Sequence, residues 1–332
     1  IWGYWGQLPP PNLIEATREA EQLGYDSVWT SEAWGSDAFS PLAYLAGHTE
    51  RIKLGTAVVQ LAARTPTATA MHVLTLDHLS GGRAILGLGV SGPQVVEGWY
   101  GQPSNRPLAR TREYVEIIRR ALAREEPVEF DGEFFQHPYH GPGSVGLGKP
   151  LKPITHPLRR EVPIYLGAEG PKNVAQTAEI ADGWLPLYYS PHHQGVYADQ
   201  LAGASDDFEI AAMVQMNIND DLDAALLPVK MMVGFYIGGM GAKGQNYHTK
   251  LMERFGYVDE ALHIQQLFMD GKREEAVAAV PDEFADAISL CGPIDRIRER
   301  LDAWRASPVT TLLVTAGGDQ GLLRTAAELV LD

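Results

Sequence analysis

A seven-residue segment, Gly167-Ala-Glu-Gly-Pro-Lys-Asn173, has the composition of an anion-binding turn. An apolar run that begins at Val162 ends at its first glycine, and a helical pattern starts at Pro171. Backbone N–H groups at a helix start can hold a phosphate, and the helix dipole strengthens their attraction for it. A plain strand-to-helix turn also favours Gly and Pro, but the adjacent cation of Lys172 favours a phosphate site.

Two carboxylates follow an earlier apolar run that ends at Thr30, namely Glu32 and Asp37. Where a reaction needs a proton, a carboxyl group enclosed by apolar side chains can supply it. Glu32 is therefore our first candidate for a catalytic acid, and Asp37 is the second. The alternative for Glu32 is that it only hydrogen-bonds backbone groups at the start of the loop.

The segment from Lys149 to Lys172 is basic, although the whole chain has a net charge of −15. Its bases are Lys149, Lys152, Arg159, Arg160 and Lys172, and its acids are Glu161 and Glu169. Such a local excess suits a ligand with an anionic tail, and a solvated loop is the alternative. The acidic balance of the whole chain would repel nucleic acid and anionic membranes, so we expect neither as a partner.

The common motifs of self-sufficient catalysts are missing from the sequence. We find no Gly-x-Ser-x-Gly elbow and no His-Glu-x-x-His pair, and the single Cys291 allows neither a disulfide nor a cysteine metal site. Gly87-Leu-Gly-Val-Ser-Gly92 matches the dinucleotide pattern, but no acidic residue ends a strand about 20 residues later. We expect these glycines to let the backbone approach a flat ring, and a cofactor to carry the chemistry.

Alternating strand and helix patterns must position these residues. Eight runs are typical of buried parallel strands: 1–4, 25–30, 51–59, 83–90, 162–167, 183–188, 208–218 and 310–315. Helical patterns lie between them at 12–23, 66–79, 113–122, 171–181, 293–306 and 320–331. About eight such units favour a closed TIM (β/α)8 barrel over an open doubly wound sheet, with the active site at the carboxyl ends of the strands.

The 332 residues fit one barrel domain with two insertions, at about 124–160 and 238–290. In the first, residues 126–136 alternate around Asp131-Gly132 as a hairpin does, and a loop rich in Gly and Pro follows. The second is typical of extra helices before the last strand. No apolar run approaches the ~20 residues of a membrane span, and no signal peptide opens the chain, so we expect a cytoplasmic protein.

Three parts of the chain together resemble the bacterial luciferase-like superfamily. They are Thr75-Leu-Asp-His-Leu-Ser-Gly-Gly-Arg-Ala-Ile-Leu-Gly-Leu-Gly89, then Gly92-Pro-Gln-Val-Val-Glu-Gly98 with Pro107-Leu-Ala-Arg-Thr-Arg-Glu-Tyr114, and Gly167-Ala-Glu-Gly-Pro-Lys-Asn-Val174 with Glu179-Ile-Ala-Asp-Gly-Trp-Leu-Pro186. The last two parts are similar to its coenzyme F420-dependent oxidoreductases, which include methylenetetrahydromethanopterin reductase. This resemblance covers almost the whole chain and implies a luciferase-like TIM barrel that forms a homodimer.

The resemblance also implies where the deazaflavin coenzyme F420 would bind. In the family, a bulge with a non-prolyl cis peptide backs the ring, which here corresponds to residues 55–59 with the cis bond between Ala57 and Val58. The ring would contact Ala57, Val58, Val59, Gln60, Val90, Ser91 and Gly92. The phosphate would contact Gly167, Ala168, Glu169, Gly170, Pro171, Lys172 and Asn173.

Two departures from the family pattern bear on the reaction. Several deazaflavin dehydrogenases have Asp-His where this chain has Glu32-Ala33, and they have Glu where this chain has Gly92. We therefore expect an F420-dependent oxidoreductase that resembles the reductases and transfers hydride to or from a small organic substrate. The alternatives are a flavin mononucleotide (FMN)-dependent luciferase-like monooxygenase and, third, a non-catalytic flavin-binding protein.

Overall fold

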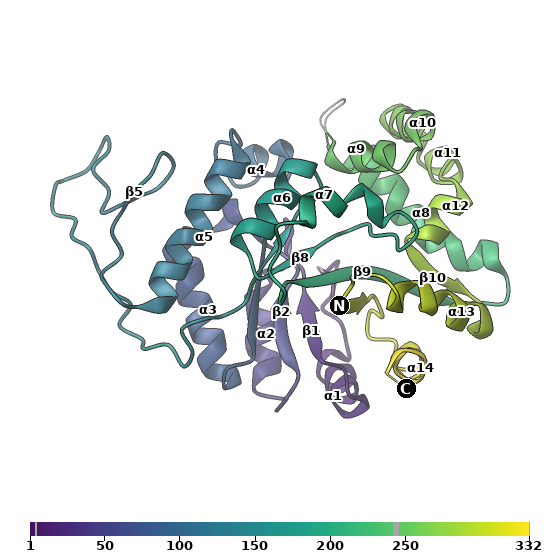
Figure 1. Cartoon of the computed structure of the whole chain (residues 1–332), viewed down its shortest axis with the longest axis horizontal. Coiled ribbons are helices and arrows are strands. Elements are labelled where there is room, and N and C mark those ends of the chain that lie inside the picture. Colours follow the sequence, from purple (N-terminus) through teal and green to yellow (C-terminus); the bar gives the residue numbers. More distant parts are fainter. Residues whose placement is uncertain (4, 242–245, 332) are drawn as a thin grey trace.

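The main sheet is parallel in every described pair and curves into a nearly closed ring (Figure 1). The computed structural model describes residues 1–3, 5–241 and 246–331. The strands follow the order β1 (Ser27–Thr30), β2 (Lys53–Thr56), β4 (Ala84–Gly89), β7 (Ile164–Gly167), β8 (Gly183–Leu185) and β9 (Glu209–Ile218). The amino half of β9 pairs with β11 (Thr311–Val314), its carboxyl half pairs with β10 (Ser289–Gly292), and β3 (Val59–Gln60) extends the sheet beside β4.

The first residues of the chain close the ring between β1 and β11. The amino group of Ile1 donates to the carbonyl oxygen of Val314 at 2.8 Å, and Trp2 forms a parallel bridge with Thr30. Tyr4, the end of the predicted first strand, lies outside the described residues. Six strands each send one buried side chain into the interior: Trp29, Ile85, Tyr165, Leu185, Ala211 and Leu313. Such a filled interior is characteristic of the TIM barrel, so the predicted fold is confirmed.

Helices cover the outside of the ring. They are α1 (Leu13–Leu23), α2 (Phe39–Ala46), α3 (Pro66–Ser80), α4 (Pro93–Gly98), α5 (Pro107–Ala123), α6 (Pro171–Ile180), α7 (Ala198–Leu201), α13 (Ile294–Arg305) and α14 (Gln320–Val330). The sequence predicts most of them, but not the short helices α2, α4 and α7. The ends of α3 show why the longer helices are predictable: the Thr65 hydroxyl accepts from the N–H of Ala68 at 3.2 Å, and Gly81 ends the helix at φ 68°.

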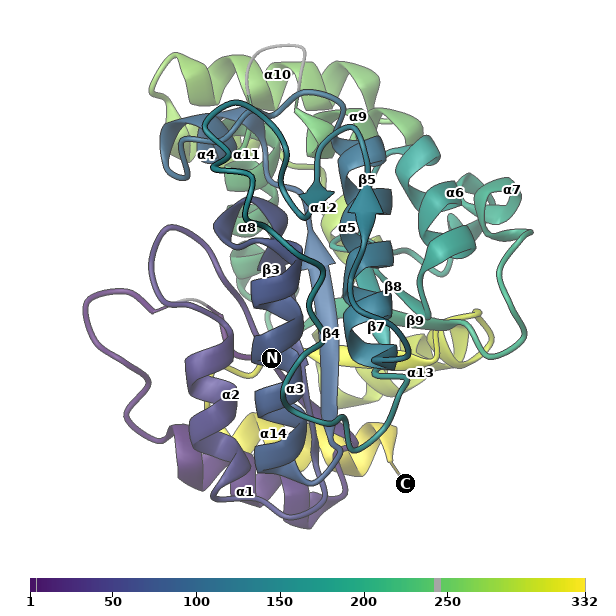
Figure 2. The same ribbon diagram turned by 90° about the vertical axis from the view of Figure 1, so that its left-hand side faces the viewer.

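The first predicted insertion forms an arm beside the barrel (Figure 1). It begins with the antiparallel pair β5 (Phe130–Asp131) and β6 (Gln136–His137), and the arm lies in front of α5 and β4 in Figure 2. The N–H of Gly132 donates to the carbonyl oxygen of Phe135, so the turn follows Asp131 rather than centring on Asp131-Gly132. The Glu113 carboxylate accepts from the N–H groups of residues 133–135, which ties the hairpin to α5.

The second predicted insertion consists of α9 (Tyr247–Arg254), α10 (Val258–Met269), α11 (Arg273–Ala278) and α12 (Asp282–Ala287). The sequence analysis missed β10, which has only four residues, and α8 (Leu222–Gly239), which is apolar on most sides and so shows no single stripe. By length and composition alone, α8 is the one described helix that could cross a membrane, and one such helix is weak evidence for a span. Its buried residues belong to a core cluster with α10, α11 and α12.

Candidate active site

A cavity of about 1220 Å³ opens at the carboxyl ends of the strands. The ends of β1, β4, β7, β8, β9 and β11 line it, and α8 and α9 add side chains from one side. Leu185, Ala211 and Leu313 of the interior layer form its base. TIM-barrel enzymes place their active sites at this end, because the loops that follow the strands converge there.

The cavity brings together most of the predicted site residues. Those that line it are Glu32, Ala57, Val58, Gln60, Val90, Ser91, Gly92, Gly167, Glu169, Gly170, Pro171, Lys172 and Asn173. Three predicted residues are not part of its lining. Val59 and Ala168 are buried in the core, and the Asp37 carboxylate accepts from the N–H groups of Phe39 and Ser40 at the start of α2.

The predicted non-prolyl cis peptide is present between Ala57 and Val58. The side chain of Val58 packs into space that two glycines leave, since a Cβ at Gly89 would lie 2.6 Å from Val58 Cγ2 and one at Gly167 3.3 Å from Val58 Cγ1. A Cβ at Gly87 would lie 1.8 Å from the carbonyl oxygen of Thr56. Gly87 and Gly89 thus make room for neighbouring protein atoms, and Gly89 also lines the cavity, so the approach of this backbone to a flat ring stays a prediction.

Glu32 is the centre of a hydrogen-bond network at the cavity wall. Its carboxylate forms two hydrogen bonds of 2.8 Å with the Arg64 guanidinium, and the side chains are only 3% and 16% exposed. The same oxygens accept from the N–H groups of Ala38 and Gln60 at 3.3 Å. The Gln60 amide then donates to the Glu32 carbonyl oxygen and accepts from the Ser91 hydroxyl at 2.8 Å. Three strand ends are thus joined around one carboxylate.

The turn from β7 to α6 leaves the helix start open to the cavity. Gly170 is the N-cap residue with φ −75° and ψ 146°, and no side chain caps the helix. A Cβ at Gly170 would meet nothing within 4 Å, so space lies directly against the backbone. Lys172 lines the cavity from the first turn of the helix. The geometry meets the requirements of an anion site at a helix N-terminus.

Burial favours the uncharged form of two titratable groups at the cavity wall. Burial raises the pKa of Glu169 to about 8 and lowers the pKa of His248 to about 4. Among the described residues, Glu169 Oε2, His248 Nδ1 and the Tyr188 hydroxyl are buried without hydrogen-bond partners. Of these groups, Tyr188 lies in the core, whereas Glu169 and His248 line the cavity.

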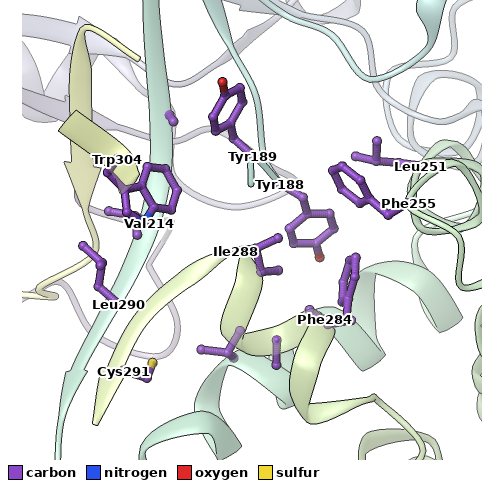
Figure 3. Close-up of a cluster of buried hydrophobic side chains, with 14 of the residues drawn as sticks. Tyr188, Tyr189, Val214, Leu251, Phe255, Phe284, Ile288, Leu290, Cys291 and Trp304 are labelled. Carbon is purple, nitrogen blue, oxygen red and sulfur yellow. The ribbon is translucent and has the colours of Figure 1, made fainter. Parts of the chain in front are cut away.

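Aromatic and histidine residues that follow the strands do not all face the cavity. Tyr188 and Tyr189 are 1% exposed and pack with Trp304 and Phe284 in the core cluster that also contains Cys291 (Figure 3). Trp34 does line the cavity, but Trp99, His192 and His193 are not part of its lining. The position of a residue near a strand end therefore does not decide whether its side chain faces the cavity.

Other cavity residues were missed by the sequence analysis: Arg106, Gln215, Met232, Tyr236, Tyr247, His248 and Thr315. Thr315 could have been found, because it ends a predicted strand, and Gln215 lies in the carboxyl half of another. Tyr247 and His248 could not, because they belong to the second insertion, whose position the β/α repeat does not fix. The pairing of Arg64 with Glu32 gave no sequence signal.

From the sequence we expected the basic segment to contact an anionic ligand, but most of it does not line the cavity. Arg159 forms an ion pair of 2.7 Å with Asp77 and donates to the carbonyl oxygen of Ala84, the first residue of β4. Arg160 lies 3.6 Å from Glu125, which follows α5. Both positions are at the amino ends of the strands, opposite the cavity. Of the five bases, only Lys172 lines it, so the local excess in sequence is not an excess in space.

Comparison with known proteins agrees with this architecture. The family model of the luciferase-like monooxygenases matches residues 3–311. The chain belongs to this family. A Mycobacterium tuberculosis protein named as a coenzyme F420-dependent oxidoreductase is 52% identical over 98% of this chain and 96% of its own length. The 5,10-methylenetetrahydromethanopterin reductase of Archaeoglobus fulgidus is 33% identical over 91% and 88%.

Among solved structures, the coenzyme F420-dependent tetrahydromethanopterin reductase of Methanopyrus kandleri matches with a TM-score of 0.78 and 23% identity. The match covers 99% of this chain and 98% of that one. The likeness confirms the luciferase-like barrel. The resemblance on which the sequence analysis relied is also confirmed at the level of the family.

Proposed function

We propose that the protein is a coenzyme F420-dependent oxidoreductase that transfers hydride between the deazaflavin and a small organic substrate. The observation that carries this proposal is 52% identity, over nearly the full length of both chains, to a protein named for that activity. The cavity supports it, because an apolar bulge and an open helix start lie within one space of about 1220 Å³. A ring with a phosphate-bearing tail needs both features.

Different groups of cavity residues fit different parts of the coenzyme. Val58, Ala57 and Val90 would support the ring, and the open turn around Gly170 would hold the phosphate. Lys172, which lines the cavity, would attract the anionic tail, whereas Arg106 on the same lining already forms an ion pair with Glu133. When bound, the deazaflavin supplies or accepts the hydride, and the chain binds it, orients it and excludes water.

The wall formed by β9 and β11 is our proposed contact surface for the substrate. Gln215 Oε1 and Thr315 Oγ1 are buried there without hydrogen-bond partners among the described residues. Both side chains line the cavity, and Met213 and Met232 form an apolar surface beside them. Buried polar atoms usually have partners, so we propose that the substrate supplies them and is thereby oriented.

We propose that Glu32 is a positioning residue. Among the described residues, its carboxylate hydrogen-bonds with Arg64 and with two backbone N–H groups. Such a group holds the ends of β1, β3 and β4 in register around the ring. The roles of Glu32 as a proton donor and of Asp37 as its substitute remain the other hypotheses, and a pH profile separates them from positioning.

We further propose that the chain is one domain, that it works in the cytoplasm and that it forms a homodimer. The arm supports a partner surface, because Val145, Leu147 and Ile154 are 83%, 85% and 95% exposed. Exposed apolar side chains in one segment are a frequent mark of a contact surface.

Lys172 and Arg160 provide a direct test of where the coenzyme lies. We expect Lys172→Ala to weaken F420 binding about fivefold to tenfold at low salt and to flatten its salt dependence, because one cation at the mouth is lost. Arg160→Ala, its control at the opposite end of the barrel, should bind within about twofold of wild type. Fluorescence titration at two ionic strengths measures both. If the two substitutions change the affinity for F420 equally, Lys172 does not belong to the coenzyme site.

A further inference from the structure

Glu169 occupies a position where a negative charge would conflict with the proposed phosphate site. It immediately precedes Gly170, the N-cap of α6, and its side chain lines the cavity. Oε1 accepts from the N–H of Leu187 at 3.2 Å, whereas Oε2 is buried with no partner in the described chain. No ion pair between described residues includes Glu169. The turn thus carries an unpaired carboxyl group beside the place for an anion.

The charge of Arg254 acts on this group, but among the described residues the two do not form an ion pair. Arg254, at the end of α9, donates to the backbone carbonyl oxygen of Glu169, and its guanidinium lies 5.5 Å from the centre of the Tyr197 ring. Arg254 Nη1 is buried without a partner among the described residues. Arg254 is not among the residues that line the cavity, so the open helix start and the Glu169 carboxyl group are the features that face the place for an anion.

We propose that Glu169 is a protonated carboxyl group that admits an anion to the turn between β7 and α6, and that loss of its proton excludes the anion. The identity of the anion as the phosphate of F420 rests on the proposed function. In the protonated form, Oε2 donates its hydrogen to a phosphate oxygen. In the ionised form, it presents a negative charge to a negative ligand in a site with little water, where such repulsion is strong.

The groups around Glu169 agree with an uncharged carboxyl. Burial raises its pKa to about 8, and the partial compensation comes from the Leu187 N–H and the Arg254 charge. His248 on α9 is neutral because burial lowers its pKa to about 4, and burial raises the pKa values of Tyr188 and Tyr197. Lys172 on α6 is the other charged group at this turn. These surroundings therefore favour the protonated form of Glu169.

The sign of the pH dependence follows from this arrangement. The ligand binds the protonated form, so its affinity is constant well below the pKa of Glu169 and falls as the pH rises through it. For one proton, the dissociation constant should increase about tenfold for each pH unit above that pKa. Binding near that pKa should also take up protons from the buffer.

The first experiment examines the free protein. The protein is labelled with ¹³C at the side-chain carboxyl carbon of its glutamates. The resonance that is present in the wild type and missing in Glu169→Gln belongs to Glu169. We expect this resonance to titrate near pH 8. Titration near the ordinary value for glutamate, about 4.3, would overturn the proposal without any ligand.

The second experiment measures the dissociation constants of F420 and of FMN, a second phosphate-bearing probe, from pH 6 to pH 9.5. It compares the wild type with Glu169→Gln and with Glu161→Gln, a control at an exposed position before β7. The ratio of the constants at pH 9.5 and pH 6 should be at least tenfold larger in the wild type and in Glu161→Gln than in Glu169→Gln. Ionisation of the ligand affects all three proteins equally and cancels.

The outcomes separate the two proposals. Binding of FMN with the expected pH dependence, but no binding of F420 at any pH, contradicts the proposed function and supports the role of Glu169. The same pH dependence in wild type and Glu169→Gln overturns the role of Glu169 and leaves the function in place. Absence of binding by either probe at pH 6 contradicts both. Calorimetry in two buffers of different ionisation enthalpy should show proton uptake in the wild type and not in Glu169→Gln.

Discussion

Arg64→Ala is expected to lower the free energy of unfolding by about 3–5 kcal/mol. The substitution leaves the Glu32 carboxylate, which is 3% exposed, without the cation that forms two hydrogen bonds of 2.8 Å with it. A buried charge that loses its partner keeps its desolvation penalty, and the two remaining backbone donors at 3.3 Å compensate only part of it. Urea denaturation followed by circular dichroism measures the change.

The exposed pair between Arg112 and Glu179 supplies the control. It also has two hydrogen bonds, of 2.8 and 2.6 Å, but its side chains are 44% and 63% exposed. Arg112→Ala should therefore change the free energy of unfolding by less than about 1 kcal/mol. If the two substitutions lower the free energy of unfolding equally, the Glu32–Arg64 pair contributes no more to stability than a surface pair does.

The same pair shows whether Glu32 positions the site or donates a proton. Glu32→Gln keeps the shape of the side chain and removes its charge. A positioning role predicts a lower kcat with the pH profile of the wild type, whereas a donor role predicts that one limb of the profile disappears. A variant with wild-type turnover would exclude both roles.

Gly170→Val is expected to weaken F420 binding about 100-fold, which corresponds to about 2.8 kcal/mol. The valine side chain would occupy the space through which the phosphate must reach the backbone N–H groups, and each hydrogen bond to a charged group contributes about 1.5–3 kcal/mol. The fold should tolerate the change, because φ is −75° and nothing lies within 4 Å of the added Cβ. Quenching of F420 fluorescence measures the affinity.

Gly203→Val is the matched control for this substitution. Gly203 is exposed, and its added Cβ also meets nothing within 4 Å, but it does not line the cavity. The affinity of Gly203→Val for F420 should equal that of the wild type. If Gly170→Val also binds normally while its melting temperature is unchanged, the phosphate does not sit on this turn.

The sequence was sufficient for the barrel and for much of the cavity, because both follow from local periodicity. Each strand pattern ends where the parallel sheet ends, so Ser91 and Gly170 must meet at one edge. It was less reliable for single side chains within a segment. Gly167 and Glu169 line the cavity and Ala168 between them does not, since successive side chains of extended backbone point to opposite sides.

Contacts between distant segments account for the remaining differences. Glu32 and Arg64 are 32 residues apart, and no local pattern announces their pairing. Arg159 is near Gly167 in sequence, yet it binds Asp77 at the other end of the barrel. Arg254 reaches the β7–α6 turn from an insertion of irregular length, so its role needed the packed structure.

The most direct test of the central claim is an equilibrium titration of the wild-type protein with F420 and with FMN at pH 7 in one buffer. We expect F420 to bind at least about tenfold more tightly than FMN, which is about 1.4 kcal/mol, because Lys172 lines the cavity and attracts the longer anionic tail of F420. FMN binding with equal or higher affinity, or no binding of F420, would contradict it and favour a flavin-dependent member of the same family.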